Sequence, residues 1–142
     1  MSDKLAVARR CADAMWDKDQ ASQALGIKVE VPAAGTAVAK MKVRADMLNG
    51  LDVCHGGLVF ALADTAFAFA CNAYDEQTVA AAAQIEFLRP AMLDDRLVAT
   101  AVEDHRGRKY GYYTVEVRNQ SDTLVALFRG RAAGTGKSML SG

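Results

Sequence analysis

The apolar segment CHGGLVFALADT, residues 54–65, contains a single charged residue, Asp64. A carboxylate is costly to remove from water unless it is paired or hydrogen-bonded, so an acid in this run points to chemistry rather than to packing. Asp64 could be a nucleophile that forms an anhydride, or a general base that activates water. The structural alternative is a buried aspartate that bonds to a neighbouring side chain or backbone amide.

Two glycines, Gly56 and Gly57, stand eight and seven residues before this acid. If they open a helix, their N–H groups have no intrahelical partner and lie at the positive end of the helix dipole. Glycine lets a ligand carbonyl approach the backbone closely, so the pair predicts an oxyanion site for acyl transfer. The alternative is that they only make a tight start to the helix.

The spacing of these residues predicts a second chain. At about 100° and 1.5 Å per residue, Asp64 shares a helical face with Gly57 but lies about 10.5 Å further along the axis. A base and an oxyanion donor that act on one carbon need to lie within about 6 Å of each other. We therefore expect a homodimer in which two antiparallel helices bring Gly56 of one chain to Asp64 of the other, in two shared sites.

Three neighbouring residues have more than one possible role. Asn49 could donate its amide to a substrate carbonyl or to water, or could simply form an Asn-Gly turn. His55 could fix the loop, polarise a carbonyl or cap the helix that follows it. Cys54 is a weaker candidate nucleophile than Asp64, because sequence neighbours in a strand or loop usually point apart and no partner Asn or Asp is evident.

Basic residues gather at one predicted turn and near other strand ends, where they could hold the phosphates of an anionic ligand. The alternative for each is a solvated hairpin tip. They are His105, Arg106, Arg108 and Lys109 at the turn, with Arg89, Arg129 and Arg131 elsewhere.

Composition limits the class of protein. We expect one domain over residues 1–142, because the length suits a single core and the composition, 51% hydrophobic and 24% charged, argues against disorder. Lys plus Arg and Asp plus Glu both total 17, so no broad nucleic-acid surface is expected.

The three cysteines are odd in number and lack CxxC spacing, which favours reduced thiols in the cytoplasm over disulfides or a zinc site. The first 20 residues do not have the pattern of a signal peptide. No apolar stretch approaches the roughly 20 residues of a membrane span, so we expect no membrane contact.

The elements that must position these residues follow from periodicity. A helix is predicted over residues 4–19, and a hairpin from strands 26–31 and 39–44 around a turn at 32–35. Residues 56–74 are apolar nearly all round, which predicts a buried central helix. Four strands in meander order then follow, at residues 78–90, 95–105, 109–119 and 123–132. The sum is an α+β protein with an antiparallel sheet curled around a helix.

With these residues in view, the chain resembles the hotdog-fold acyl-CoA thioesterases, in particular the phenylacetate-degradation thioesterase family. The resemblance covers most of the chain and rests on MLNGLDVCHGGLVFALADTAFAFACNAY (47–74), IEFLRP (85–90) and VALFRGRA (125–132). It implies dimers with a continuous sheet around two antiparallel helices, commonly paired into homotetramers. It also implies hydrolysis of coenzyme A thioesters without a metal or other cofactor.

The resemblance implies roles for four residues of the central segment. Asp64 would be the catalytic carboxylate and Gly56 the oxyanion donor, with Asn49 and His55 orienting the thioester or the water. The implied substrate is an aryl-acetyl or hydroxyaryl-acetyl thioester. A hotdog hydratase or dehydratase acting on acyl thioesters and a non-catalytic acyl-CoA binding module are the alternatives.

Substrate contacts are expected at six positions, namely Gly57, Phe60, Thr65, Arg89, Arg106 and Lys109. The resemblance implies basic residues near the phosphates of coenzyme A, and Phe60 would help to form the wall of the acyl pocket. Some similar thioesterases position water with a serine on the strand after the central helix. Residues 80–83 are all alanine here, so Thr65 could take that role, or the role could be absent.

Overall fold

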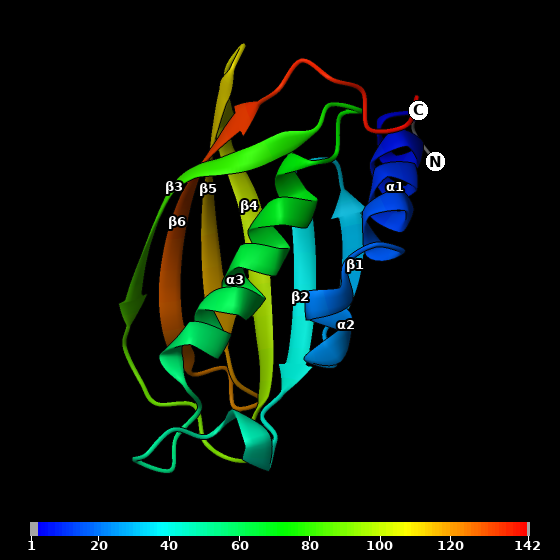
Figure 1. Ribbon diagram of the computed structural model, residues 1–142. Helices are drawn as coiled ribbons and strands as arrows, with labels where there is room; N and C mark the ends of the chain where they lie inside the picture. Colours follow the sequence, from blue (N-terminus) through cyan, green and yellow to red (C-terminus); the bar gives the residue numbers. More distant parts are fainter. Residues whose placement is uncertain (1–2, 142) are drawn as a thin grey trace.

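A six-stranded antiparallel sheet curves around one long helix (Figure 1). The computed structural model describes residues 3–141. The helices are α1 (Asp3–Trp16), α2 (Gln20–Ala24), the 3-10 turn η1 (Ala45–Met47) and α3 (Gly56–Cys71). The strands are β1 (Lys28–Ala33), β2 (Thr36–Lys42), β3 (Thr78–Phe87), β4 (Arg96–Arg106), β5 (Tyr110–Arg118) and β6 (Leu124–Gly134). The predicted α+β hotdog arrangement is confirmed.

The main core lies between α3 and the concave side of the sheet. The ring of Phe67 on α3 packs against Tyr113 of β5 and Phe128 of β6, with ring centroids 5.5 and 5.6 Å apart. Gly130 permits this approach, since a Cβ atom at that position would lie 2.7 Å from the Phe67 ring. The helix predicted to be central and buried is therefore fixed directly against the middle of the sheet.

The N-terminal elements differ from the prediction in their boundaries. The first helix ends at Trp16, and α2 begins separately because the Asp19 side chain caps it, accepting from the Ser22 N–H at 3.0 Å. Strand β1 continues through Pro32, whose missing N–H is tolerated on an edge strand. The turn is consequently shorter than predicted and is made by Gly35, which has a φ of 85°.

The predicted meander of four strands is wrong at its first member. The sheet order is β1-β2-β4-β5-β6-β3, so β4, β5 and β6 form a meander while β3 pairs with β6 at the far edge. The long connection through η1 and α3 carries the chain across the concave side before β3 begins. The loop between β3 and β4 then returns the chain to a place beside β2.

Strand β3 is exposed along nearly its whole length. Only Thr78 and Ile85 are partly buried, and Val79 and Phe87 each retain 55% exposure. An exposed apolar edge strand is a surface on which another strand can pair.

None of the helices within residues 3–141 has the length and apolar character that a membrane-spanning helix requires.

Candidate active site at the start of helix α3

His55 caps α3 and accepts hydrogen bonds from most of the backbone N–H groups in its first turn. Its Nδ1 accepts from the Gly57 N–H at 2.9 Å, and its carbonyl accepts from Leu58 and Val59. No acceptor among residues 3–141 pairs with the Gly56 N–H. Gly56 therefore has the unpaired donor that an oxyanion site needs, whereas the N–H of Gly57, also expected at the substrate, is used within the chain.

The contacts of His55 show two of its three expected roles, loop anchoring and helix capping. Its own N–H donates to the Met47 carbonyl at 2.8 Å, which holds the preceding loop against η1. Because Nδ1 accepts a hydrogen bond, the neutral ring has its proton on Nε2. Because His55 is exposed, its Nε2–H can still donate a hydrogen bond to a substrate.

Asn49 forms the turn that the sequence offered as one alternative. Its Oδ1 accepts from the N–H groups of Leu51 and Val53, at 2.9 and 3.3 Å, and its own N–H donates to the Val53 carbonyl. The side-chain NH₂ group has no acceptor among residues 3–141. The same residue can therefore build the loop with its oxygen and bind a ligand with its nitrogen.

Three of the predicted site residues, Asn49, Gly56 and Arg89, line one cavity of about 280 Å³. Loop residues that precede α3 form one wall, and the segment that follows β3 forms another. The remaining lining is mainly apolar and includes Val59 and Phe87. A cavity with donors at one end and apolar walls suits a carbonyl compound with a small apolar group.

Asp64 lies outside this cavity, near the middle of α3. Its side chain is half-buried, no hydrogen bond or ion pair joins it to another of residues 3–141, and burial raises the pKa of its carboxyl group. Since α3 is one continuous helix, Asp64 lies about 12 Å along the axis from Gly56. The predicted separation of Asp64 from Gly56 and Gly57 along one helix is confirmed.

Phe60 and Thr65 have contacts within the chain. The Phe60 ring packs edge-on against Phe128 with centroids 5.3 Å apart, so it separates α3 from β6 and does not line the Gly56 cavity. The Thr65 hydroxyl donates to the Ala61 carbonyl at 2.8 Å and lies 3.0 Å from the Ser22 hydroxyl of α2. These contacts give Thr65 a role in joining two helices and leave its predicted part in positioning water without support.

The three basic residues predicted to hold phosphates do not gather within one chain. Arg89 lines the cavity at the start of α3. Arg106 and Lys109 lie at the β4–β5 hairpin, at the opposite end of the sheet (Figure 1). There Arg106 stacks 3.9 Å from the centre of the Tyr74 ring and pairs with Glu76 at 3.7 Å.

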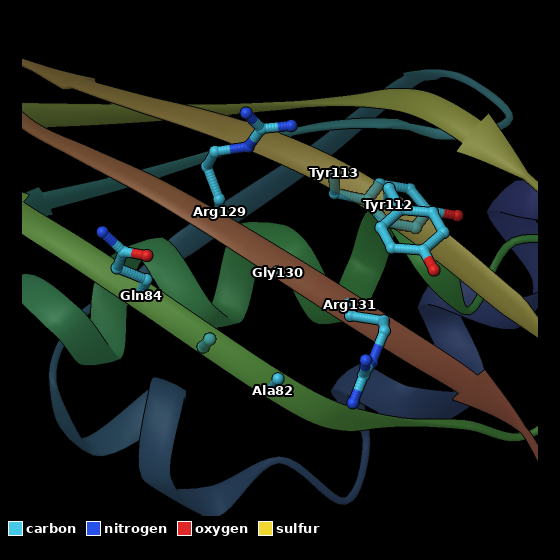
Figure 2. A pocket seen from close by; sticks show the side chains of 8 residues that line it. Ala82, Gln84, Tyr112, Tyr113, Arg129, Gly130 and Arg131 are labelled. Atoms are coloured by element: carbon cyan, nitrogen blue, oxygen red, sulfur yellow. The ribbon is translucent and has the colours of Figure 1, made fainter.

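Arg129 and Arg131, also noted in the sequence, line a separate hollow of about 460 Å³ on β3, β5 and β6. Figure 2 shows their side chains beside Gln84 and Tyr112. Arg129 has a carboxylate partner in Asp104, 4.0 Å away.

Phe87 is an aromatic residue of this cavity that the sequence analysis did not single out. It lies in the quoted segment IEFLRP, two residues after Ile85, so the two share one face of β3. Ile85 packs against the core, and this alternation was the available signal that Phe87 also faces α3.

Comparison with known proteins identifies the family of this chain. The family model described as the thioesterase superfamily matches residues 51–126. The acyl-coenzyme A thioesterase PaaI of Escherichia coli K12 is 49% identical over 121 residues, which cover 85% of this chain and 86% of that protein.

Two solved structures extend the comparison. That of the E. coli PaaI protein, from the phenylacetic acid degradation operon, superposes with a TM-score of 0.93 and 45% identity, covering 96% of this chain and 99% of the other. A hypothetical thioesterase of Streptococcus pneumoniae TIGR4, solved with coenzyme A, gives a TM-score of 0.75 at 26% identity and covers 79% and 90% of the two chains. The resemblance predicted from the sequence is confirmed, and the chain belongs to the thioesterase superfamily as a thioester hydrolase with the hotdog fold.

Proposed function

We propose that the protein hydrolyses acyl-coenzyme A thioesters to a free acid and coenzyme A. The unpaired Gly56 N–H, at the positive end of α3 and in a cavity with apolar walls, carries this proposal. The name of the E. coli relative and the coenzyme A in the S. pneumoniae structure support it. Aryl-acetyl or hydroxyaryl-acetyl groups are the proposed acyl class, because the E. coli protein comes from the phenylacetic acid degradation operon.

The active site is proposed to be shared between two chains. In one chain, a half-buried acid without a partner and an unpaired amide lie about 12 Å apart on the same helix. The exposed strand β3 offers an edge for pairing with a second β3, which would set two α3 helices antiparallel. Asp64 of one chain would then approach Gly56 of the other, and two such dimers would form the expected tetramer.

The proposed reaction uses these groups in order. The thioester carbonyl oxygen accepts from the Gly56 N–H, with the Asn49 side-chain amide as a second donor. Asp64 of the other chain either takes a proton from the attacking water or attacks the carbonyl carbon itself. The carbon–sulfur bond then breaks, the thiolate of coenzyme A leaves and is protonated, and in the second route water hydrolyses the anhydride.

Phosphate binding could also combine two chains. Antiparallel α3 helices place the first turn of one beside the last turn of the other. Arg89 lies at one end of the sheet, and Arg106 and Lys109 lie at the other end. These cations are therefore proposed to meet around coenzyme A only in the dimer.

Release of free thiol from phenylacetyl-CoA and a panel of other acyl-CoAs tests the reaction. Asp64→Asn should lower kcat by about 10² to 10⁴, the range for loss of a general base. Asp17→Asn, which removes an exposed acid from the end of α1, is the matched control and should leave the rate unchanged. Equal rates in wild type and Asp64→Asn would remove this carboxylate from the mechanism.

Two further outcomes would favour the other functions. Water addition to an enoyl-CoA without thiol release indicates a hydratase, and tight binding of acyl-CoA with neither activity indicates a binding module. A single turnover in ¹⁸O-labelled water tests the covalent route for Asp64. Label incorporated into its carboxylate indicates an anhydride that water opens at the Asp64 carbonyl. Label in the product acid alone is expected both for a general base and for an anhydride that water opens at the acyl carbonyl.

Mixed dimers test the shared site. Chains with Asp64→Asn lack the carboxylate, and in chains with Gly56→Val the added side chain crowds Phe87 and blocks access to the residue 56 amide. Both parent dimers are therefore expected to be inactive, because every site in them has one impaired group. Each mixed dimer has one site with both groups intact, so random pairing should restore about a quarter of wild-type activity. Activity no higher than that of either parent would exclude a site divided in this way.

A further inference from the structure

Phe87 is a large aromatic residue held over the proposed oxyanion donor. A Cβ atom added to Gly56 would lie 3.2 Å from Cζ and 3.4 Å from Cε1 of the Phe87 ring, so the ring lies against the Gly56 backbone. The ring is nevertheless 55% exposed, although its register partner on β6, Ala126, is fully buried. Phe87 thus turns an open aromatic surface toward the cavity.

The backbone on both sides of this cavity is fixed. After Phe87, the N–H groups of Leu88 and Arg89 both donate to the Val125 carbonyl, at 2.8 and 3.2 Å. On the facing wall, the Cys54 N–H donates to the Ala91 carbonyl at 2.8 Å. The backbone that carries Phe87 therefore has a defined position before any substrate binds, which is a property of residues that select ligands by shape.

We infer that Phe87 is a specificity-determining residue whose ring packs against the acyl group and favours flat aromatic groups over flexible aliphatic ones. The inference rests on the proposed function, in which the carbonyl oxygen binds the Gly56 N–H. A carbonyl within hydrogen-bond distance of that amide places its acyl carbons beside the ring. Offset or edge contacts between aromatic rings stabilise such a pair beyond the area they bury.

The size of the cavity agrees with a short acyl group. Its volume of about 280 Å³ is at the lower limit for small-molecule sites, so it suits one ring better than a long chain.

The test compares hydrolysis of phenylacetyl-CoA and hexanoyl-CoA by wild type, Phe87→Leu and Met92→Ala. Met92 is 48% exposed on the loop that follows β3 and does not line the cavity, so it is the matched control. Phe87→Leu should lower kcat/KM for phenylacetyl-CoA about tenfold more than for hexanoyl-CoA. Met92→Ala should leave the ratio of the two kcat/KM values within about twofold of wild type.

Equal losses on the two substrates would assign Phe87 a structural role only and would overturn the inference. A second measurement separates this failure from failure of the proposed function. Calorimetry with the non-hydrolysable thioether analogues of both substrates gives the same selectivity ratio without turnover. If wild type releases no thiol from either substrate, the proposed hydrolysis of these thioesters is refuted. If Phe87→Leu leaves the ratio of the two analogue affinities unchanged, a role of Phe87 in selectivity is excluded, whatever the outcome for hydrolysis.

Discussion

Replacing Asp64 by asparagine should stabilise the fold while it removes the proposed catalytic carboxylate. The substitution keeps the shape of the side chain and removes its charge. In the structure this carboxylate is half-buried, and no hydrogen bond or ion pair from residues 3–141 supports its ionised form. Burial without a partner raises the pKa of this carboxyl group, so folding disfavours its ionised form.

The sign of the pH dependence follows from linkage. Because the pKa is higher in the folded chain, the folded state binds more protons than the unfolded state between the two pKa values. The contribution of Asp64 to the free energy of unfolding therefore falls as pH rises through this window and is constant above it. Asparagine does not titrate, so the gain in Asp64→Asn should increase as pH rises through the raised pKa and should vanish below the ordinary aspartate pKa of about 3.9.

The partial burial of Asp64 limits the size of the effect. Burying an unpaired amide costs about 1 to 3 kcal/mol and burying an unpaired charge costs more, so the gain is the difference between the two costs, which residual solvation of Asp64 limits to about 1 kcal/mol. For a chain of 142 residues this corresponds to an increase in Tm of about 3 °C. Urea unfolding at pH 7 and pH 4, with wild type and Asp17→Asn beside it, measures the difference.

A lower stability of Asp64→Asn at pH 7 would refute this reasoning. It would mean that the ionised carboxylate accepts hydrogen bonds that stabilise the native state, which is the structural alternative that the sequence left open. A stability gain combined with loss of turnover would instead be typical of a functional residue retained at the expense of stability.

Other substitutions test single contacts. His55→Ala removes the cap of α3 and should cost about 1 kcal/mol in urea unfolding, whereas His55→Asn should retain most of that stability; lost turnover in His55→Asn alone would then assign chemistry to the ring. Glu103 accepts 2.8 Å hydrogen bonds from two tyrosines, of which Tyr113 is 2% exposed, so Glu103→Leu should cost about 2 to 4 kcal/mol and Glu103→Gln less. Gly56→Ala should destabilise wild type through its contact with Phe87 but not a Phe87→Leu background, and equal effects in the two melting curves would contradict the contact. If Asp64 is the base, kcat/KM should rise with pH through its raised pKa.

Patterns within single elements were predictable from the sequence. The apolar run after His55 predicted the central helix. The number of residues between Gly56 and Asp64 predicted their separation, because this distance depends only on helical geometry. The place of β3 was not predictable in this way. Strand order depends on where a long connection crosses the sheet, and alternation within a strand contains no information about that crossing.

In the candidate site too, features that depend on one element were predictable, and features that depend on contacts between elements were not. The unpaired N–H of Gly56, on which its proposed oxyanion role rests, could be predicted from its place at the start of a helix. The hydrogen bond that occupies the Gly57 amide could not, because it depends on the side-chain torsions of His55. The separation of Arg89 from Arg106 was not predictable, because it depends on the positions of β3 and β4 in the sheet. Phe87 was not predicted as a site residue, because its place in the site depends on a contact with Gly56, which lies more than 30 positions earlier in the sequence.

The features that support a shared site each leave something unsatisfied in the single chain. The Gly56 amide has no acceptor among residues 3–141, Asp64 has no donor there, and β3 exposes an apolar edge. Unpaired polar groups and open sheet edges are individually unfavourable, so their concentration around one helix needs a common cause. Pairing of two chains through β3 would cover the edge and bring the amide and the acid to opposite sides of one bound thioester. On that account the same residues that lower the stability of one chain supply the chemistry of two.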